Sequence, residues 1–100
     1  MPRKAARPFD FSNLDVLKDP EQAARYLEEI LADGDIEMFK EALKDVAAAR
    51  VGNMTTLAKK THLAREALYT SLSRKGNPRL DTLTKVLDAA GLRLTVTTAS

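Results

Sequence analysis

The sequence predicts an all-α protein of five helices, two of which form a helix-turn-helix, followed by a short C-terminal β-strand. Apolar residues recur at intervals of three and four along most of the chain. Residues that start and stop helices bound these stretches closely, so the connections between helices are short. With 100 residues, of which 44% are hydrophobic, the chain has the size and composition of one domain.

The N-terminus shows no helical period. Residues 1–8 combine three cations with two prolines and few apolar groups, which is typical of a flexible basic arm. Residues 9–17 supply apolar side chains at irregular spacing, and we expect this segment to lie extended across a protein surface. Phe9, Phe11 and Leu14 are therefore candidate contacts with a protein partner.

Two longer helices are predicted over residues 20–32 and 36–50. An acidic N-cap precedes each helix, and a glycine follows each, because glycine readily adopts the left-handed conformation that ends a helix. The residues that mark these limits are Asp19, Pro20 and Gly34 for the first helix and Asp35 and Gly52 for the second.

Three shorter helices are predicted in the second half of the chain. The first opens at Asn53 and ends near His62, and the second spans residues 63–73. A polar loop follows, and the third helix spans residues 80–90, with Gly91 as its stop. The turn between the first two is too brief for antiparallel packing, which is typical of a helix-turn-helix.

One arc of the second short helix carries a guanidinium, a carboxylate, a phenol and a hydroxyl, since successive residues turn by about 100°. Such side chains can hydrogen-bond base edges in a major groove, and neighbouring cations can contact phosphates. The alternative is an ordinary solvated helix face. The predicted base-reading residues are Arg65, Glu66, Tyr69 and Thr70, and the predicted phosphate contacts are Thr55, Lys59, Lys60, Arg74, Lys75, Asn77 and Arg79.

The net charge is only +2, but the charges are unevenly placed. Residues 1–50 hold eight Lys and Arg against eleven Asp and Glu, whereas residues 51–100 hold eight against three. A basic half suits a polyanion and an acidic half suits a basic protein, although such asymmetry also arises by chance in small domains.

The C-terminal tail changes to a period of two, with apolar Leu92, Leu94 and Val96 and β-branched residues, which predicts a strand. The chain offers no second strand to pair with it. We therefore expect a homodimer in which the tail pairs with its symmetry mate, placing two recognition helices on half-sites ~34 Å apart in a palindromic operator. The alternative is that the tail packs against the last helix.

Composition excludes several function classes. The chain has no Cys and one His, His62, so it lacks the residues for a disulfide framework, a zinc cluster or a cysteine nucleophile. We predict no catalytic residues, no metal and no cofactor, and hence not an enzyme. No apolar run approaches the ~20 residues of a membrane helix and the N-terminus has no signal-peptide pattern, so we expect a cytoplasmic protein with no membrane partner.

Short motifs along the chain carry a family resemblance. They are Phe9-Asp10, Tyr26-Leu27, Asp33-Gly34-Asp35, Leu-Ala-Lys-Lys-Thr before His62, Arg65-Glu66-Ala-Leu-Tyr69, Gly76-Asn77-Pro78 and Gly91-Leu-Arg-Leu-Thr-Val96. Over about residues 9–96 they resemble the addiction module antidote proteins, helix-turn-helix antitoxins related to the HigA kind. The implied fold is a five-helix lambda-repressor-like helix-turn-helix domain.

The resemblance implies double-stranded DNA and a small basic toxin as partners. The protein would bind its own operator as a dimer, associating with the nucleoid, and neutralise a co-encoded toxin of the RelE/ParE superfamily. Residues 9–35 would hold the toxin contact, and residues 36–100 the DNA-binding domain with the dimerisation strand. The candidate toxin contacts are Phe9, Phe11, Leu14 and Tyr26, although aromatic residues at such spacing more often belong to a core.

Two residues depart from the usual motif. His62 stands where the turn usually has glycine, which is tolerable because His is enriched among the non-glycine residues at positive φ. Ala64 stands where Ser or Thr usually caps the recognition helix, which costs about 1 kcal/mol and removes a phosphate ligand.

Two other functions stay open on the sequence. One is a helix-turn-helix transcriptional repressor with the same DNA-binding half and no toxin partner. The other is a protein-interaction adaptor in which the two short helices only pack.

Overall fold

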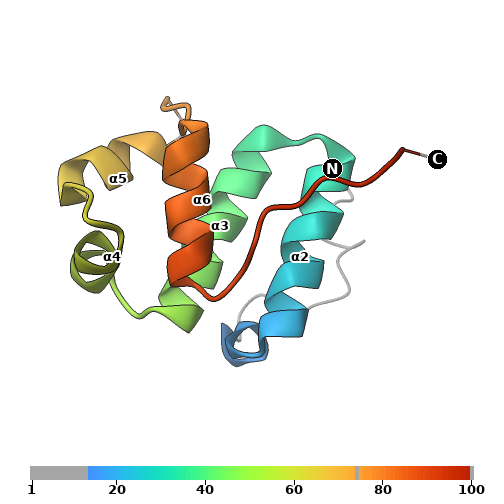
Figure 1. Cartoon of the computed structure of the whole chain (residues 1–100), viewed down its shortest axis with the longest axis horizontal. Helices are drawn as coiled ribbons and strands as arrows, with labels where there is room; N and C mark the ends of the chain where they lie inside the picture. Colours follow the sequence, from blue (N-terminus) through green and yellow to red (C-terminus); the bar gives the residue numbers. More distant parts are fainter. Residues whose placement is uncertain (1–13, 74, 100) are drawn as a thin grey trace.

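The computed structural model describes residues 14–73 and 75–99 of the chain. Five α-helices and one short 3-10 helix make up the regular structure of this part, which contains no β-strand (Figure 1). The predicted all-α class is therefore confirmed. In chain order the elements are η1 Leu14–Lys18, α2 Pro20–Asp33, α3 Ile36–Arg50, α4 Met54–Thr61, α5 Arg65–Ser71 and α6 Leu80–Ala89.

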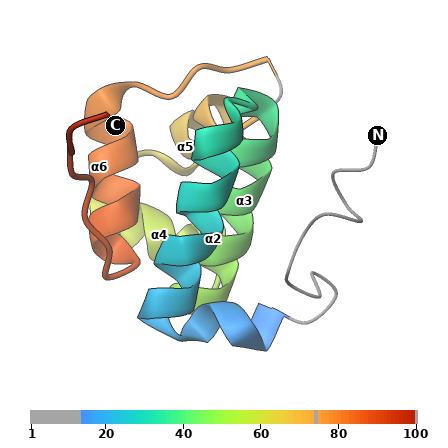
Figure 2. The same ribbon diagram turned by 90° about the vertical axis from the view of Figure 1, so that its right-hand side faces the viewer.

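The helices form two groups around α3. The first consists of α2, which packs along α3, and η1, which crosses the ends of both helices (Figure 2). The second consists of the short helices α4 and α5 with α6, and α4 packs against both of the others. A single cluster of buried apolar residues joins the two groups, so the short helices are held on the same core as α2 and α3.

The N-caps predicted at Asp19 and Asp35 are confirmed, and Asn53, where the next helix was expected to open, is an N-cap as well. The side chains of Asp19, Asp35 and Asn53 each accept a hydrogen bond from the backbone N–H three residues on, at 3.1, 3.0 and 2.8 Å. Gly34 ends α2 in the left-handed conformation with φ 78°. These bonds satisfy backbone groups that a helix end leaves unpaired, which is why the limits could be predicted locally.

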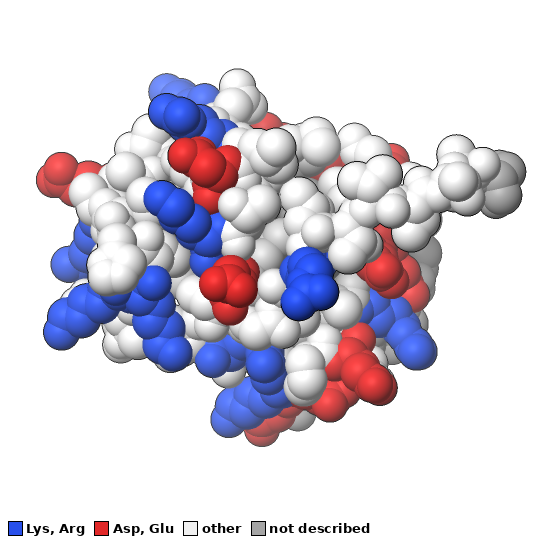
Figure 3. All heavy atoms as spheres, in the orientation of Figure 1, with Lys and Arg blue, Asp and Glu red and all other residues white. Residues whose placement is uncertain are grey.

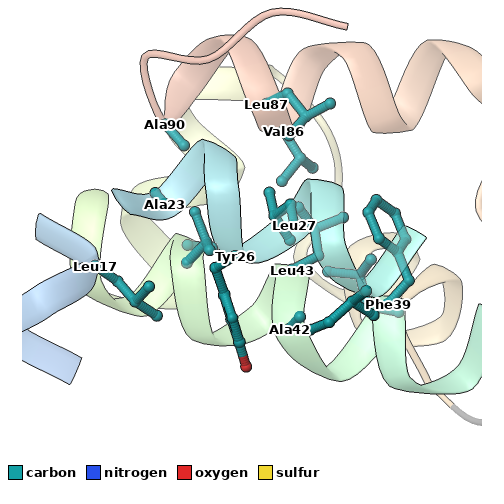
Figure 4. Close-up of a cluster of buried hydrophobic side chains, with 14 of the residues drawn as sticks. Leu17, Ala23, Tyr26, Leu27, Phe39, Ala42, Leu43, Val86, Leu87 and Ala90 are labelled. Atoms are coloured by element: carbon teal, nitrogen blue, oxygen red, sulfur yellow. The ribbon is translucent and has the colours of Figure 1, made fainter. Parts of the chain in front are cut away.

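The core is built from one face of each long helix (Figure 4). At its centre lie Ala42, Leu43 and Val46 of α3, all of which are fully buried. The Tyr26 ring runs through the cluster, and its hydroxyl reaches the edge, where it donates to Asp45 Oδ2 at 3.1 Å. This hydrogen bond offsets the cost of removing the phenol hydroxyl from water.

Two expectations for the N-terminus have different outcomes. Residues 14–17, expected to be extended, belong to the 3-10 helix η1, because Leu17 turns into the core with only 1% of its surface exposed. That prediction was wrong. The basic arm predicted over residues 1–8, together with Phe9 and Phe11, lies outside the described residues.

The predicted C-terminal strand is not formed. Leu92, Leu94 and Val96 lie in an irregular segment that runs from the end of α6 past α2 (Figure 1). A strand requires a hydrogen-bonding neighbour, and this part of the chain provides none. Instead Leu92 packs, partly buried, against the core, whereas Val96 is 96% exposed.

The limits of the short helices also differ slightly from the predicted ones. The helix predicted over residues 63–73 spans only Arg65–Ser71. Residues 63 and 64 belong to the turn instead, because Ala64 has the extended backbone of an N-cap, with φ −66° and ψ 140°. The last α-helix ends at Ala89, and Gly91 follows at φ 82° as predicted.

Candidate nucleic-acid interface

Helices α4 and α5 are joined by a tight three-residue turn, residues 62–64. His62 holds the left-handed conformation with φ 59° and ψ 30°, and it is the one non-glycine residue of the described chain with positive φ. The next backbone N–H, of Leu63, returns to the Ala58 carbonyl at 3.2 Å. Leu57 and Leu68, which are 1% and 0% exposed, anchor the two helices to the core. The tolerance of His62 for positive φ is therefore confirmed.

The four predicted base-reading residues share the outer face of α5. Arg65, Glu66, Tyr69 and Thr70 are all exposed, whereas Leu68 faces the core. The Arg65 guanidinium carbon lies 5.7 Å from the centroid of the Tyr69 ring, within cation–π range. This contact orients a planar hydrogen-bond donor outward beside a phenol that is half exposed.

Cationic and polar side chains border this face on two sides. On α4, Thr55, Lys59 and Lys60 are exposed. In the segment between α5 and α6, Lys75, Asn77 and Arg79 are exposed; Arg74 is not among the described residues. Figure 3 shows that blue side chains gather over α4, at the lower left of the molecule, whereas the surface over α5 above it is largely white. The arrangement presents a cationic surface of the kind that polyanions bind.

One of these cations has an acidic neighbour. Arg79 Nε lies 3.3 Å from Asp81 Oδ1, and the two side chains are 81% and 57% exposed. An ion pair this exposed is worth little in water, so the carboxylate does not prevent Arg79 from exchanging it for a phosphate.

The α5–α6 loop is held from below by a buried lysine that the sequence analysis did not single out. Lys40 of α3 is 1% exposed, and its Nζ donates to the carbonyl oxygens of Ser73 at 2.8 Å and Gly76 at 2.5 Å. Glu37 Oε2 lies 3.2 Å from the same nitrogen. The loop that carries Lys75 and Asn77 is thus fastened to the central helix.

A second cation does the same at the other end of α3. Arg50 Nε donates to the Ala90 carbonyl at 2.7 Å, and its Nη1 donates to the Lys18 carbonyl. Cations favour helix C-termini, because the last carbonyls there lack intrahelical partners. Arg50 therefore ties the ends of α6 and η1 to α3.

The sequence contains a signal that Lys40 and Arg50 bond to groups inside the protein. Lys40 and Arg50 fall three or four residues from Leu43 and Val46, on the stripe that α3 buries. A cation in such a position must find acceptors inside the protein. The period places both cations on the inward face of α3, where Lys40 is buried and Arg50 is half-buried, but it does not show which carbonyls accept their hydrogen bonds.

Ala64 occupies the N-cap position of α5, as the sequence predicts. Ala64 makes no side-chain hydrogen bond to the first turn of the helix. The N-cap side chain therefore satisfies none of the backbone N–H groups of that turn.

The candidate toxin contacts are scattered. Tyr26 is 2% exposed and belongs to the core, and Leu14 begins η1. Exposed apolar surface lies instead on α2 and the C-terminal tail, where Leu31 and Leu94 are 44% and 40% exposed. These two side chains border a shallow groove between α2, α6 and the tail.

No group of three or more His, Cys, Asp or Glu side chains in residues 14–73 and 75–99 could hold a metal ion. Within the same ranges, no helix has both the length and the hydropathy to cross a membrane.

Fold and site together define a class: a small all-helical protein with two short helices that present a cationic face. Residues 6–98 match the family model described as "Probable addiction module antidote protein". The chain belongs to this family, which confirms the resemblance found in the sequence.

One relative is similar over most of its length. It is an uncharacterized protein of Haemophilus influenzae (strain ATCC 51907 / DSM 11121 / KW20 / Rd), which is 40% identical over 87 residues, covering 87% of this chain and 88% of the relative. No solved structure matches the chain.

Proposed function

We propose that the protein is a DNA-binding antitoxin that represses its own operon and neutralises a co-encoded toxin of the RelE/ParE superfamily by direct binding. The family match over residues 6–98 carries this proposal, because an antidote implies a toxin partner. Both activities are binding events in the cytoplasm, and neither requires a catalytic group.

In the DNA-binding half, α4 and α5 act as the helix-turn-helix and α5 enters the major groove. Arg65, Glu66, Tyr69 and Thr70 read base edges, and the exposed cations of α4 and of the α5–α6 loop contact phosphates. The common outward face of the four α5 residues supports this assignment.

In the antitoxin half, residues 9–35 contact the toxin. Since Tyr26 is buried, the described contact surface on α2 consists of other side chains. Leu31 is 44% exposed and lines the groove together with Glu28, an exposed acid. An apolar group beside a carboxylate suits a small basic protein.

The protein acts as a homodimer through its C-terminal tail. Leu94, which lines the groove beside α2, is 40% exposed, and Val96, two residues further along the tail, is 96% exposed. Contact between two symmetry-related tails would bury them and place two copies of α5 on a palindromic operator.

The test is a fluorescence-anisotropy titration of the purified protein against its own upstream DNA and against a scrambled duplex, at two salt concentrations. Each titration is repeated with the product of the adjacent reading frame. We expect preferential, salt-dependent binding of the upstream DNA that the neighbouring product changes.

Other results point to other functions. Preferential binding that does not respond to the neighbouring product would indicate a repressor without a toxin partner. Equal binding of both duplexes, or none, would contradict DNA-directed function and favour a protein-interaction adaptor.

A further inference from the structure

We propose that Lys40, although buried beneath the surface, positions the α5–α6 loop for contact with DNA phosphates. The inference rests on the proposed function, since it assigns a role in the DNA binding described above. Lys40 is a positioning residue, because its own side chain is 1% exposed and cannot reach a ligand.

The contacts of the ammonium group fix the loop at two points. Nζ donates to the Ser73 carbonyl, just beyond α5, and to the Gly76 carbonyl in the middle of the loop. Glu37 balances its charge from the preceding turn of α3. Both carbonyls belong to the backbone, so their distance from Nζ sets the path of the main chain.

The residues on either side of the anchored Gly76 face solvent. Lys75 and Asn77 are both exposed. Gly76 itself packs so closely on the end of α5 that an added Cβ would lie 1.7 Å from the Thr70 carbonyl oxygen. The loop is therefore packed closely on α5 at Gly76 and is bonded to Lys40 at the same residue, which sets where Lys75 and Asn77 stand relative to α5.

Stability alone does not explain a lysine at this position. Removing an ammonium group from water is costly, and a buried ion pair replaced as a whole by apolar residues often loses no stability. A methionine would fill the same space but would leave the two loop carbonyls without this donor, so the loop would lose its attachment to α3. What the lysine contributes is a pair of hydrogen bonds that hold the loop in one position.

The experiment compares Lys40→Met with Lys44→Met. Lys44 lies one turn further along α3, is 39% exposed and pairs with Glu41 at 3.1 Å rather than with the loop. Both variants lose one positive charge, so a general effect of net charge on DNA affinity cancels between them. The measurements are anisotropy with upstream and scrambled DNA over a range of salt, amide hydrogen exchange, and far-ultraviolet circular dichroism.

For Lys40→Met we expect faster exchange in residues 72–79 with retained helical signal. Affinity for the upstream DNA should fall about five- to tenfold relative to Lys44→Met, and the slope of log affinity against log salt should fall by about one, as for one lost phosphate contact. A variant that only lost stability would keep its salt slope once folded.

Gly76→Ala tests the same loop from the other side and leaves Lys40 unchanged. It should also weaken DNA binding and flatten the salt slope, because the new methyl group displaces the loop from α5. If Lys40→Met does not fold, Gly76→Ala still tests whether the position of the α5–α6 loop sets the affinity for DNA.

Wild-type preference for the upstream DNA, with Lys40→Met and Gly76→Ala binding as Lys44→Met does, would overturn the role of Lys40 and leave the proposed function intact. If the wild-type protein shows no preference, the proposed function fails, and the role of Lys40 in it fails too.

Discussion

At the scale of single residues, the candidate interface depends on cations in two very different environments. Arg65 and the α4 lysines stand in solvent and are free to meet a polyanion, whereas Lys40 and Arg50 end on backbone carbonyls. The difference comes from their place on the helix, since an outward cation keeps its hydration and an inward one must be paired. Cationic side chains are therefore available to a ligand in one case and hold the backbone in the other.

Substitution of Arg65 should reduce sequence discrimination. If its guanidinium reads a guanine, Arg65→Ala weakens binding of the upstream DNA by ~1–3 kcal/mol, with much less effect on a scrambled duplex. Lys59→Ala is the comparison, because loss of a phosphate contact weakens both duplexes about equally and flattens the salt dependence. Anisotropy titrations measure both effects, and equal losses for Arg65→Ala on the two duplexes would exclude it as a base reader.

At the scale of elements, α3 is the scaffold on which the other helices are positioned. Its buried face carries apolar residues, and its two inward cations grip the α5–α6 loop at one end and the ends of α6 and η1 at the other. The short helices α4 and α5 have little independent stability, because helices of this length are marginal in water. Their orientation is thus determined by packing on α6 and α3.

Loss of the Arg50 clamp should destabilise the whole fold. Arg50→Met removes two charge-assisted hydrogen bonds that join separate elements, and we expect the free energy of unfolding to fall by about 1.5–3 kcal/mol. Urea denaturation measures this change. Arg25→Met, at an exposed position of α2, is the matched control and should lie within about 0.5 kcal/mol of wild type.

The uncapped start of α5 should respond to an added hydroxyl. Ala64 already has the extended backbone of an N-cap, so Ala64→Ser should stabilise the protein by about 1 kcal/mol. The same substitution at exposed Ala48, inside α3, should destabilise it slightly, because serine is a poorer helix former than alanine. Thermal unfolding of the two variants distinguishes a cap from a general effect of serine, and equal shifts would rule the cap out.

At the scale of the whole molecule, charge and apolar surface separate along the chain. The cations of α4, α5 and the following loop gather at one end, and the tail with its exposed apolar residues runs past α2 (Figures 1 and 3). A dimer formed through the tails therefore leaves the cationic ends free for DNA.

The proposed dimer gives a prediction at this scale. We expect the wild-type protein to sediment as a dimer and Val96→Asp to sediment as a monomer with an unchanged helical signal. Val96 is 96% exposed, so the substitution costs the single chain nothing, whereas two carboxylates near a two-fold axis repel each other. Thr97→Asp, at the next exposed residue of the tail, replaces no apolar side chain and should stay dimeric, and a dimeric Val96→Asp would exclude this interface.

The sequence determined the features that depend on near neighbours along the chain. Caps at Asp19, Asp35 and Asn53, the positive φ of His62 and the outward arc of α5 all arise from interactions spanning a few residues. Such interactions are set by residue type and spacing, so they can be predicted without the fold.

Tertiary structure alone decided the contacts between distant parts. The hydrogen bonds of Lys40 span 33 and 36 residues and those of Arg50 span 40 and 32, and no local pattern selects those carbonyls. Tyr26 belongs to the core because Asp45 receives its hydroxyl, and the tail is irregular because a strand needs a neighbour that the described chain lacks. In each case the deciding partner is one that folding, rather than sequence proximity, brings near.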